Sequence, residues 1–87
     1  MKRLVSVTEV DGEGLMALIG QRVTLMCCNY FYTGKLVGVN RDDVLLEDAG
    51  IVYDTGELTG EKWADMQPLP GAWYVRTAAI ESYGIMK

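Results

Sequence analysis

The sequence predicts a mostly β domain, in which a short N-terminal helix precedes five strongly bent antiparallel strands that form a partly open barrel. Three observations support this fold class. The chain has 87 residues, which is enough for one small domain. From residue 22 onward, apolar and polar residues alternate in short runs, as in strands with one buried face. Glycines inside these runs favour the bends by which a small sheet curls into a barrel.

The N-terminal part of the chain contains two predicted elements. Residues 1–10 are rich in valine, leucine and threonine and predict an extra strand or an ordered arm. Residues 11–20 predict a helix of one or two turns, with Asp11 as a candidate N-cap and Gly20 as a C-terminal stop. A helix this short needs to pack on the rest of the domain. Its apolar face consists of Leu15, Leu18 and Ile19.

The five strands follow from alternation and turn residues. They are predicted at residues 22–28, 32–39, 44–53, 73–77 and 79–85. Residues 29–31 and the polar run Asn40-Arg41-Asp42-Asp43 form the first two turns. The third strand is predicted to kink at Gly50, and Ala78 makes a tight corner between the last two. The predicted core consists of Leu15, Leu18, Ile19, Val23, Leu25, Leu36, Val44, Leu46, Val75 and Ile80.

Residues 54–71 predict a long loop between the third and fourth strands, because they hold three glycines and both prolines. Loops of this length often carry function. Trp63 within it is either a contact residue or a side chain that folds back on its own core. With this loop included, residues 11–87 are predicted to form a single domain, preceded by the arm at residues 1–10.

The composition narrows the function classes. Eight basic and twelve acidic residues give a net charge of -4, which disfavours binding to duplex DNA. The chain has no histidine, and adjacent strand residues such as Cys27 and Cys28 point to opposite faces, so no metal site is expected. No nucleophile–base pair is visible, and we expect neither an enzyme nor a cofactor.

The same composition bears on location. No apolar run approaches the roughly 20 residues of a membrane span. Thr8, Glu9 and Asp11 interrupt the apolar core that a signal peptide needs. We therefore expect a cytoplasmic protein without a membrane partner.

An open barrel leaves two strand edges with unpaired N–H and C=O groups. A second copy of the chain can pair with these edges and supply core that a chain of this length lacks. The sequence therefore predicts a homo-oligomer.

Two motifs in order resemble the Sm and Sm-like (LSm) family across residues 15–85. The first consists of residues 20–25, 32–36, 39–40 and 44–49. In it, Gly34 stands two residues before the core leucine Leu36, and the segment at residues 44–49 contains the run Leu46-Glu47-Asp48. The family's second motif is an apolar residue, Arg, Gly, two variable residues and an apolar residue. Here it reads Val75-Arg76-Thr77-Ala78-Ala79-Ile80.

The resemblance implies an Sm-like (SH3-like) barrel that assembles into a closed ring through its fourth and fifth strands. It also implies a site for U- or A-rich single-stranded RNA at the pore, where a base stacks between the turn after the second strand and the arginine of the second motif. The candidate RNA-binding residues are Asn40, Arg41, Asp43, Arg76 and Thr77.

Three positions depart from the family. Asn40 stands where the family commonly has Asp, and Asp43 stands where the base-reading Asn falls. An ionised carboxylate accepts hydrogen bonds, donates none and repels phosphate. Thr77 replaces the family's glycine and narrows the pocket. These departures favour a second hypothesis, a structural or protein-interaction ring that has lost base recognition. For Arg76 the alternative is an ion pair with Glu81 or Asp43.

Overall fold

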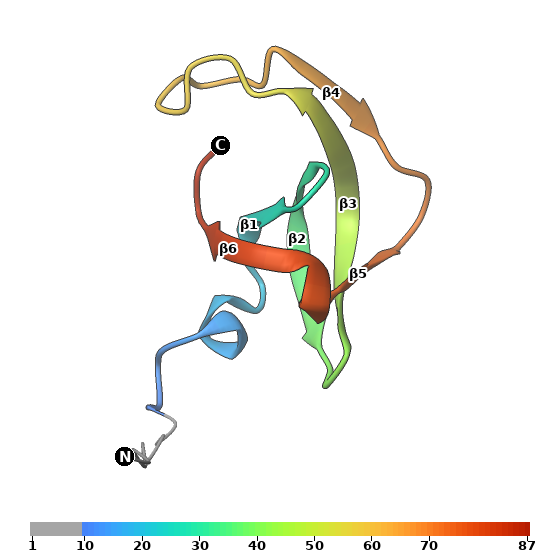
Figure 1. Ribbon diagram of the computed structural model, residues 1–87. Helices are drawn as coiled ribbons and strands as arrows, with labels where there is room; N and C mark the ends of the chain where they lie inside the picture. The colour runs from blue at the N-terminus through green and yellow to red at the C-terminus, as the bar shows by residue number, and fades with distance from the viewer. Residues whose placement is uncertain (1–9) are drawn as a thin grey trace, which may run out of the picture.

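One antiparallel sheet of six strands makes up most of the computed structural model, which describes residues 10–87 (Figure 1). The strands are β1 (Arg22–Cys27), β2 (Phe31–Val39), β3 (Asp43–Asp54), β4 (Asp65–Pro68), β5 (Trp73–Arg76) and β6 (Ile80–Gly84). The sheet has the order β4-β3-β2-β1-β6, β5 pairs with β3, and the two ends of the sheet do not pair with each other. The mostly β fold is confirmed, with one strand more than the sequence predicts.

The extra strand, β4, lies inside the predicted loop of residues 54–71. Its sequence, Asp-Met-Gln-Pro, is short and ends in proline, so it carries only a weak strand signal. It forms because the second half of β3 offers an unpaired edge, along which Gly50 pairs with Pro68 and Val52 with Met66.

The long strand β3 changes partners along its length. Its first residues pair with β5, with Val44 opposite Val75, and its later residues pair with β4. Between the two parts, Asp48 has a positive φ of 50° and the register against β2 shifts. The Arg22 guanidinium donates to the Asp48 carbonyl at 3.1 Å and to its carboxylate at 3.2 Å. The irregularity in β3 thus lies at Asp48, and the predicted position at Gly50 is wrong by two residues.

At Gly34, β2 lies close against β3. A Cβ atom at this position would lie 3.1 Å from the Ala49 Cα, the Glu47 carbonyl oxygen and the Leu46 Cβ. Any side chain here would push the two strands apart. The missing side chain lets Leu36, two residues further, pack fully into the core.

The core lies on one face of the bent sheet and agrees with most of the prediction. Fully or nearly fully buried are Val23, Leu25, Leu36, Val44, Leu46 and Val75. Leu15, Leu18 and Ile80 are half-buried against this cluster. Ile19 is 46% exposed, so the prediction that it is buried is wrong.

A single 3₁₀ turn, η1 (Leu15–Leu18), replaces the predicted N-terminal helix. Gly12 and Gly14 have φ values of 84° and 82°, which are incompatible with a right-handed helix from residue 11. In a 3₁₀ turn Leu15 and Leu18 lie on the same side, and Ile19 points away from it. The predicted arm at residues 1–10 lies outside the described residues, apart from Val10.

The strands predicted as fourth and fifth occupy separate edges of the sheet. Among the strands of residues 10–87, β5 pairs with β3 alone and β6 with β1 alone. The 3₁₀ turn η2 (Thr77–Ala79) joins them where the sequence predicts a tight corner. Within residues 10–87, no helix has the length and apolar character needed to cross a membrane.

Candidate nucleic-acid interface

The turn between β2 and β3 lies against the junction of β5 and η2. The Thr77 backbone N–H donates to the Asp42 carbonyl at 2.9 Å, and the Thr77 hydroxyl donates to the Arg41 carbonyl at 3.3 Å. Asp43 pairs directly with Arg76 in the β3–β5 ladder. The structure therefore brings together all five residues that the sequence proposes for the site, although the two segments lie far apart in the chain.

The turn itself is closed by two hydrogen bonds between the same residues. The Asn40 backbone N–H donates to the Asp43 carbonyl at 2.8 Å. The Asn40 side-chain amide donates to Oδ1 of Asp43 at 2.9 Å. Within residues 10–87, one amide N–H and the Oδ1 acceptor of Asn40 have no hydrogen-bond partner, nor does the second carboxylate oxygen of Asp43.

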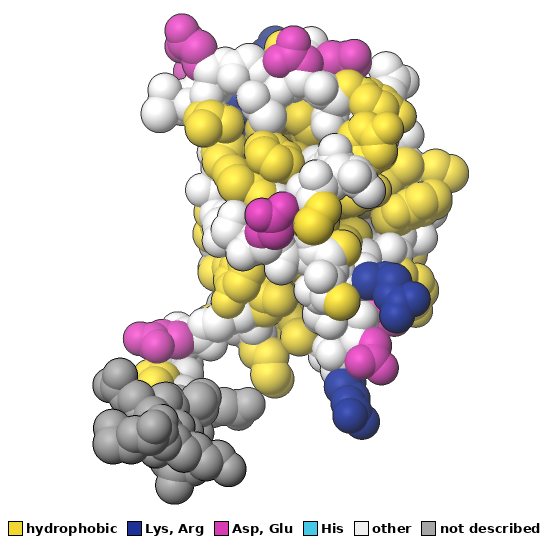
Figure 2. Space-filling model, in the orientation of Figure 1, with side chains coloured by type: hydrophobic (Ala, Val, Ile, Leu, Met, Phe, Trp, Pro, Cys, Tyr) yellow, Lys and Arg dark blue, Asp and Glu magenta, His cyan; other side chains and the backbone are white. Residues whose placement is uncertain are grey.

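Two arginines supply the positive charge of the site. Arg41 and Arg76 are both exposed. Within residues 10–87, neither guanidinium forms an ion pair or a side-chain hydrogen bond, so the alternative pairing of Arg76 with Glu81 or Asp43 does not occur. Figure 2 shows basic and acidic side chains gathered at the lower right of the molecule, over the end of the sheet where this turn lies in Figure 1.

Tyr74 adds an aromatic side chain that the sequence-based site lacks. It lies two residues before Arg76 on β5, so both side chains are on the outer face of the strand. Tyr74 is 61% exposed, and Val75 between them is buried. The alternation of the strand carries the signal that would have found it, because burial of Val75 puts both of its neighbours outside.

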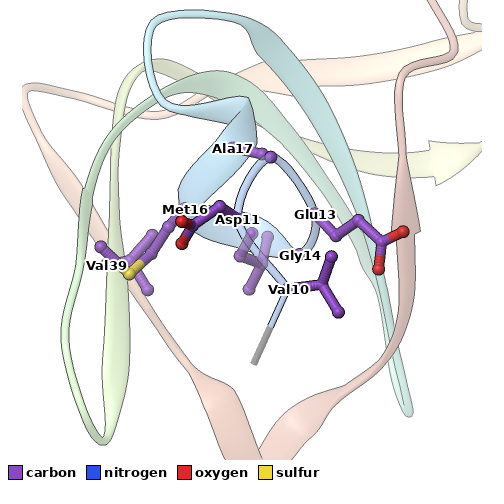
Figure 3. A pocket seen from close by; sticks show the side chains of 9 residues that line it. Val10, Asp11, Glu13, Gly14, Met16, Ala17 and Val39 are labelled. Atoms are coloured by element: carbon purple, nitrogen blue, oxygen red, sulfur yellow. The ribbon is translucent and has the colours of Figure 1, made fainter. Parts of the chain in front are cut away.

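A separate pocket lies beside η1 and is distinct from this site. It has a volume of about 690 Å³ and is lined by residues 10–17 and Val39. Figure 3 shows Asp11, Glu13 and Met16 around it. None of the five candidate residues lines this pocket. In residues 10–87 no group of three or more histidine, cysteine or acidic residues is arranged to hold a metal ion.

Lys87 and Trp63 form a second cluster, at the loop between β3 and β4. The Lys87 ammonium donates to the carbonyls of Thr55 at 2.8 Å and Lys62 at 3.0 Å, and also to that of Glu57. It lies 4.7 Å from the centre of the Trp63 ring, a cation–π distance. Trp63 thus packs on its own chain, and the cluster anchors the end of the chain to this loop.

Compared with known proteins, the chain matches no protein-family model and no curated protein sequence.

Proposed function

We propose that this protein is an Sm-like, ring-forming protein that binds single-stranded RNA through the β2–β3 turn and the β5–η2 junction. The observation that carries the proposal is that Arg41 and Arg76, both without an ion-pair partner in residues 10–87, lie on segments that the hydrogen bonds of Thr77 hold together. An arginine that only stabilises the fold would be expected to form an ion pair, but within residues 10–87 Arg41 and Arg76 form none, although Arg76 lies opposite Asp43 in the β3–β5 ladder. These two are left available to an external anion or base.

The chemistry of the site suits a nucleotide. A guanidinium is planar and can stack on a base or hold a phosphate through its paired N–H groups. Tyr74 offers a second flat surface on the same face of β5. The free amide groups of Asn40 can hydrogen-bond a base edge. Single-stranded RNA presents all three partners, whereas duplex RNA hides its base edges.

Assembly into a ring would repeat this site around a pore. Within residues 10–87, the outer edges of β5 and β6 have no pairing strand, and exposed apolar side chains lie on or beside these strands. They are Trp73 and Tyr74 on β5, Tyr83 on β6 and Ile85 just after β6. Pairing of β5 in one subunit with β6 in the next would cover both edges and place weak sites close together, which multiplies their affinity for one RNA strand. A monomer mass by light scattering at micromolar concentration would contradict the ring.

The second candidate is a ring scaffold without base recognition. Two observations favour it: the net charge of -4 opposes phosphate binding, and Asn40 and Asp43 already satisfy part of each other's hydrogen bonding. This candidate shares the edges of β5 and β6 with the first and differs only at the turn.

RNA binding at low salt separates the two candidates. We expect fluorescein-labelled oligo-U or oligo-A to bind the wild-type protein in an anisotropy titration. Arg76→Ala should weaken binding roughly 5- to 150-fold, the loss expected for one stacked base. The matched control is Lys35→Ala, which removes the same charge from an exposed position on β2. Equal weakening by both variants would mean that only net charge matters. No binding of any oligonucleotide would favour the scaffold.

A further inference from the structure

The proposed site contains a hydrogen-bond acceptor, the Asp43 carboxylate, and a donor, the Arg76 guanidinium, on neighbouring strands directly opposite each other. Asp43 and Arg76 are register partners in the antiparallel β3–β5 ladder, so both side chains leave the sheet on the same face. The Cβ atoms of such a pair lie about 5 Å apart. In residues 10–87 the two side chains form no ion pair with each other. A carboxylate acceptor and a guanidinium donor thus face solvent next to each other.

The Asn40 side chain holds the carboxylate in place. Its amide donates to Oδ1 of Asp43 at 2.9 Å, which orients the carboxylate and leaves lone pairs on both oxygens. The side chain of Asp43 is half-buried, so fewer water molecules compete for it than for an exposed aspartate. This carboxylate can accept two hydrogen bonds from a ligand that presents two adjacent N–H groups.

Among the four RNA bases, guanine alone has two neighbouring donors on its Watson–Crick edge, N1–H and the N2 amino group, next to the acceptor O6. Uracil has one N–H between two carbonyl oxygens, so a carboxylate there gains one hydrogen bond and meets a repelling oxygen. Adenine and cytosine each place a ring-nitrogen acceptor beside their amino group. A carboxylate therefore discriminates against all three.

We propose that this site prefers guanine, with Asp43 accepting from N1–H and N2–H and the Arg76 guanidinium donating to O6. The inference rests on the proposed function, because it names the base that the same site reads. It also departs from the uridine or adenine preference that the family resemblance implies. A planar two-bond contact of this kind discriminates between bases by roughly 5- to 150-fold.

Anisotropy titrations test the preference with labelled oligo-U into which single guanines are introduced, because long guanine runs self-associate. We expect the guanine-containing strand to bind the wild type more tightly than oligo-U by a factor in that range. Replacing guanine with inosine, which lacks the N2 amino group, should remove most of the gain.

Asp43→Asn is the decisive variant, and Asp42→Asn is its matched control. Both remove one negative charge from the same turn, but the Asp42 side chain is exposed and makes no hydrogen bond in residues 10–87. Asp43→Asn keeps an oxygen that can accept from Asn40, and circular dichroism would check the fold. We expect Asp43→Asn to lose the preference for guanine and Asp42→Asn to keep it.

Three outcomes are distinguishable. Loss of the guanine preference in Asp43→Asn alone supports the inference. Binding that depends on Arg76 but shows no guanine preference, or a preference unchanged in Asp43→Asn, overturns the inference and leaves the proposed function standing. Absence of RNA binding by the wild type overturns both.

Discussion

Replacing Gly34 with alanine is expected to destabilise the fold more than any other single methyl addition to β2. The added Cβ would lie 3.1 Å from the Ala49 Cα, the Glu47 carbonyl oxygen and the Leu46 Cβ. Two of these atoms belong to the backbone of β3, so no flexible side chain can move aside. Relief requires β2 and β3 to separate by a few tenths of an ångström at the position where both face the core.

The magnitude follows from two opposing terms. Overpacking a well-packed core costs about 1–3 kcal/mol. Alanine also reduces the conformational entropy of the unfolded chain relative to glycine, which stabilises by about 0.4–1 kcal/mol. The expected net loss in the free energy of unfolding for Gly34→Ala is therefore about 1–2 kcal/mol. With a urea m-value of about 1–3 kcal/mol/M for a chain of this size, the unfolding midpoint should fall by roughly 1 M.

Gly38→Ala provides the control in the same strand. Its Cβ would meet only the Leu45 Cβ, at 3.4 Å, which is an ordinary contact. We expect this variant to be as stable as the wild type or slightly more stable. Urea unfolding followed by circular dichroism measures both variants under the same conditions. If Gly34→Ala and Gly38→Ala unfold at the same midpoint, the close approach of β2 and β3 does not constrain the fold as argued.

The remaining predictions concern the contacts of Lys87 with the β3–β4 loop and the reactivity of the two cysteines. Lys87→Met should lower the melting temperature by several degrees, because it removes the hydrogen bonds to three loop carbonyls and the contact with Trp63, together worth about 1 kcal/mol. Lys62→Met, which changes an exposed side chain nearby, should leave the melting temperature unchanged. Equal shifts of the melting temperature in both variants would contradict the role of the cluster. Iodoacetamide should label the exposed Cys28 well before Cys27, as read by tandem mass spectrometry. Burial, with Cys28 and Glu81 nearby, raises the pKa of the Cys27 thiol, so its labelling should increase only at a pH above the usual range for cysteine. Labelling of both at equal rates would show that Cys27 is accessible.

Much of the architecture is predictable from local patterns in the chain. The alternation of Val23, Leu25 and Cys27 depends only on the two-residue period of a strand, and β1 begins at the expected residue. The polar run at residues 40–43 forms the expected turn between β2 and β3, because Asn and Asp favour turns through local hydrogen bonds. The residues of the candidate site are predicted from the resemblance to a family, and the structure places their two segments side by side.

Other features depend on contacts between distant segments, which no local pattern records. The strand β4, the bend at Asp48 and the contact of Lys87 with Trp63 arise because β3 curves and offers an edge, a carbonyl and a loop to partners elsewhere in the chain. For the same reason, the opposition of Asp43 and Arg76 is a property of strand pairing, because a register between residues 33 positions apart is set by packing of the core.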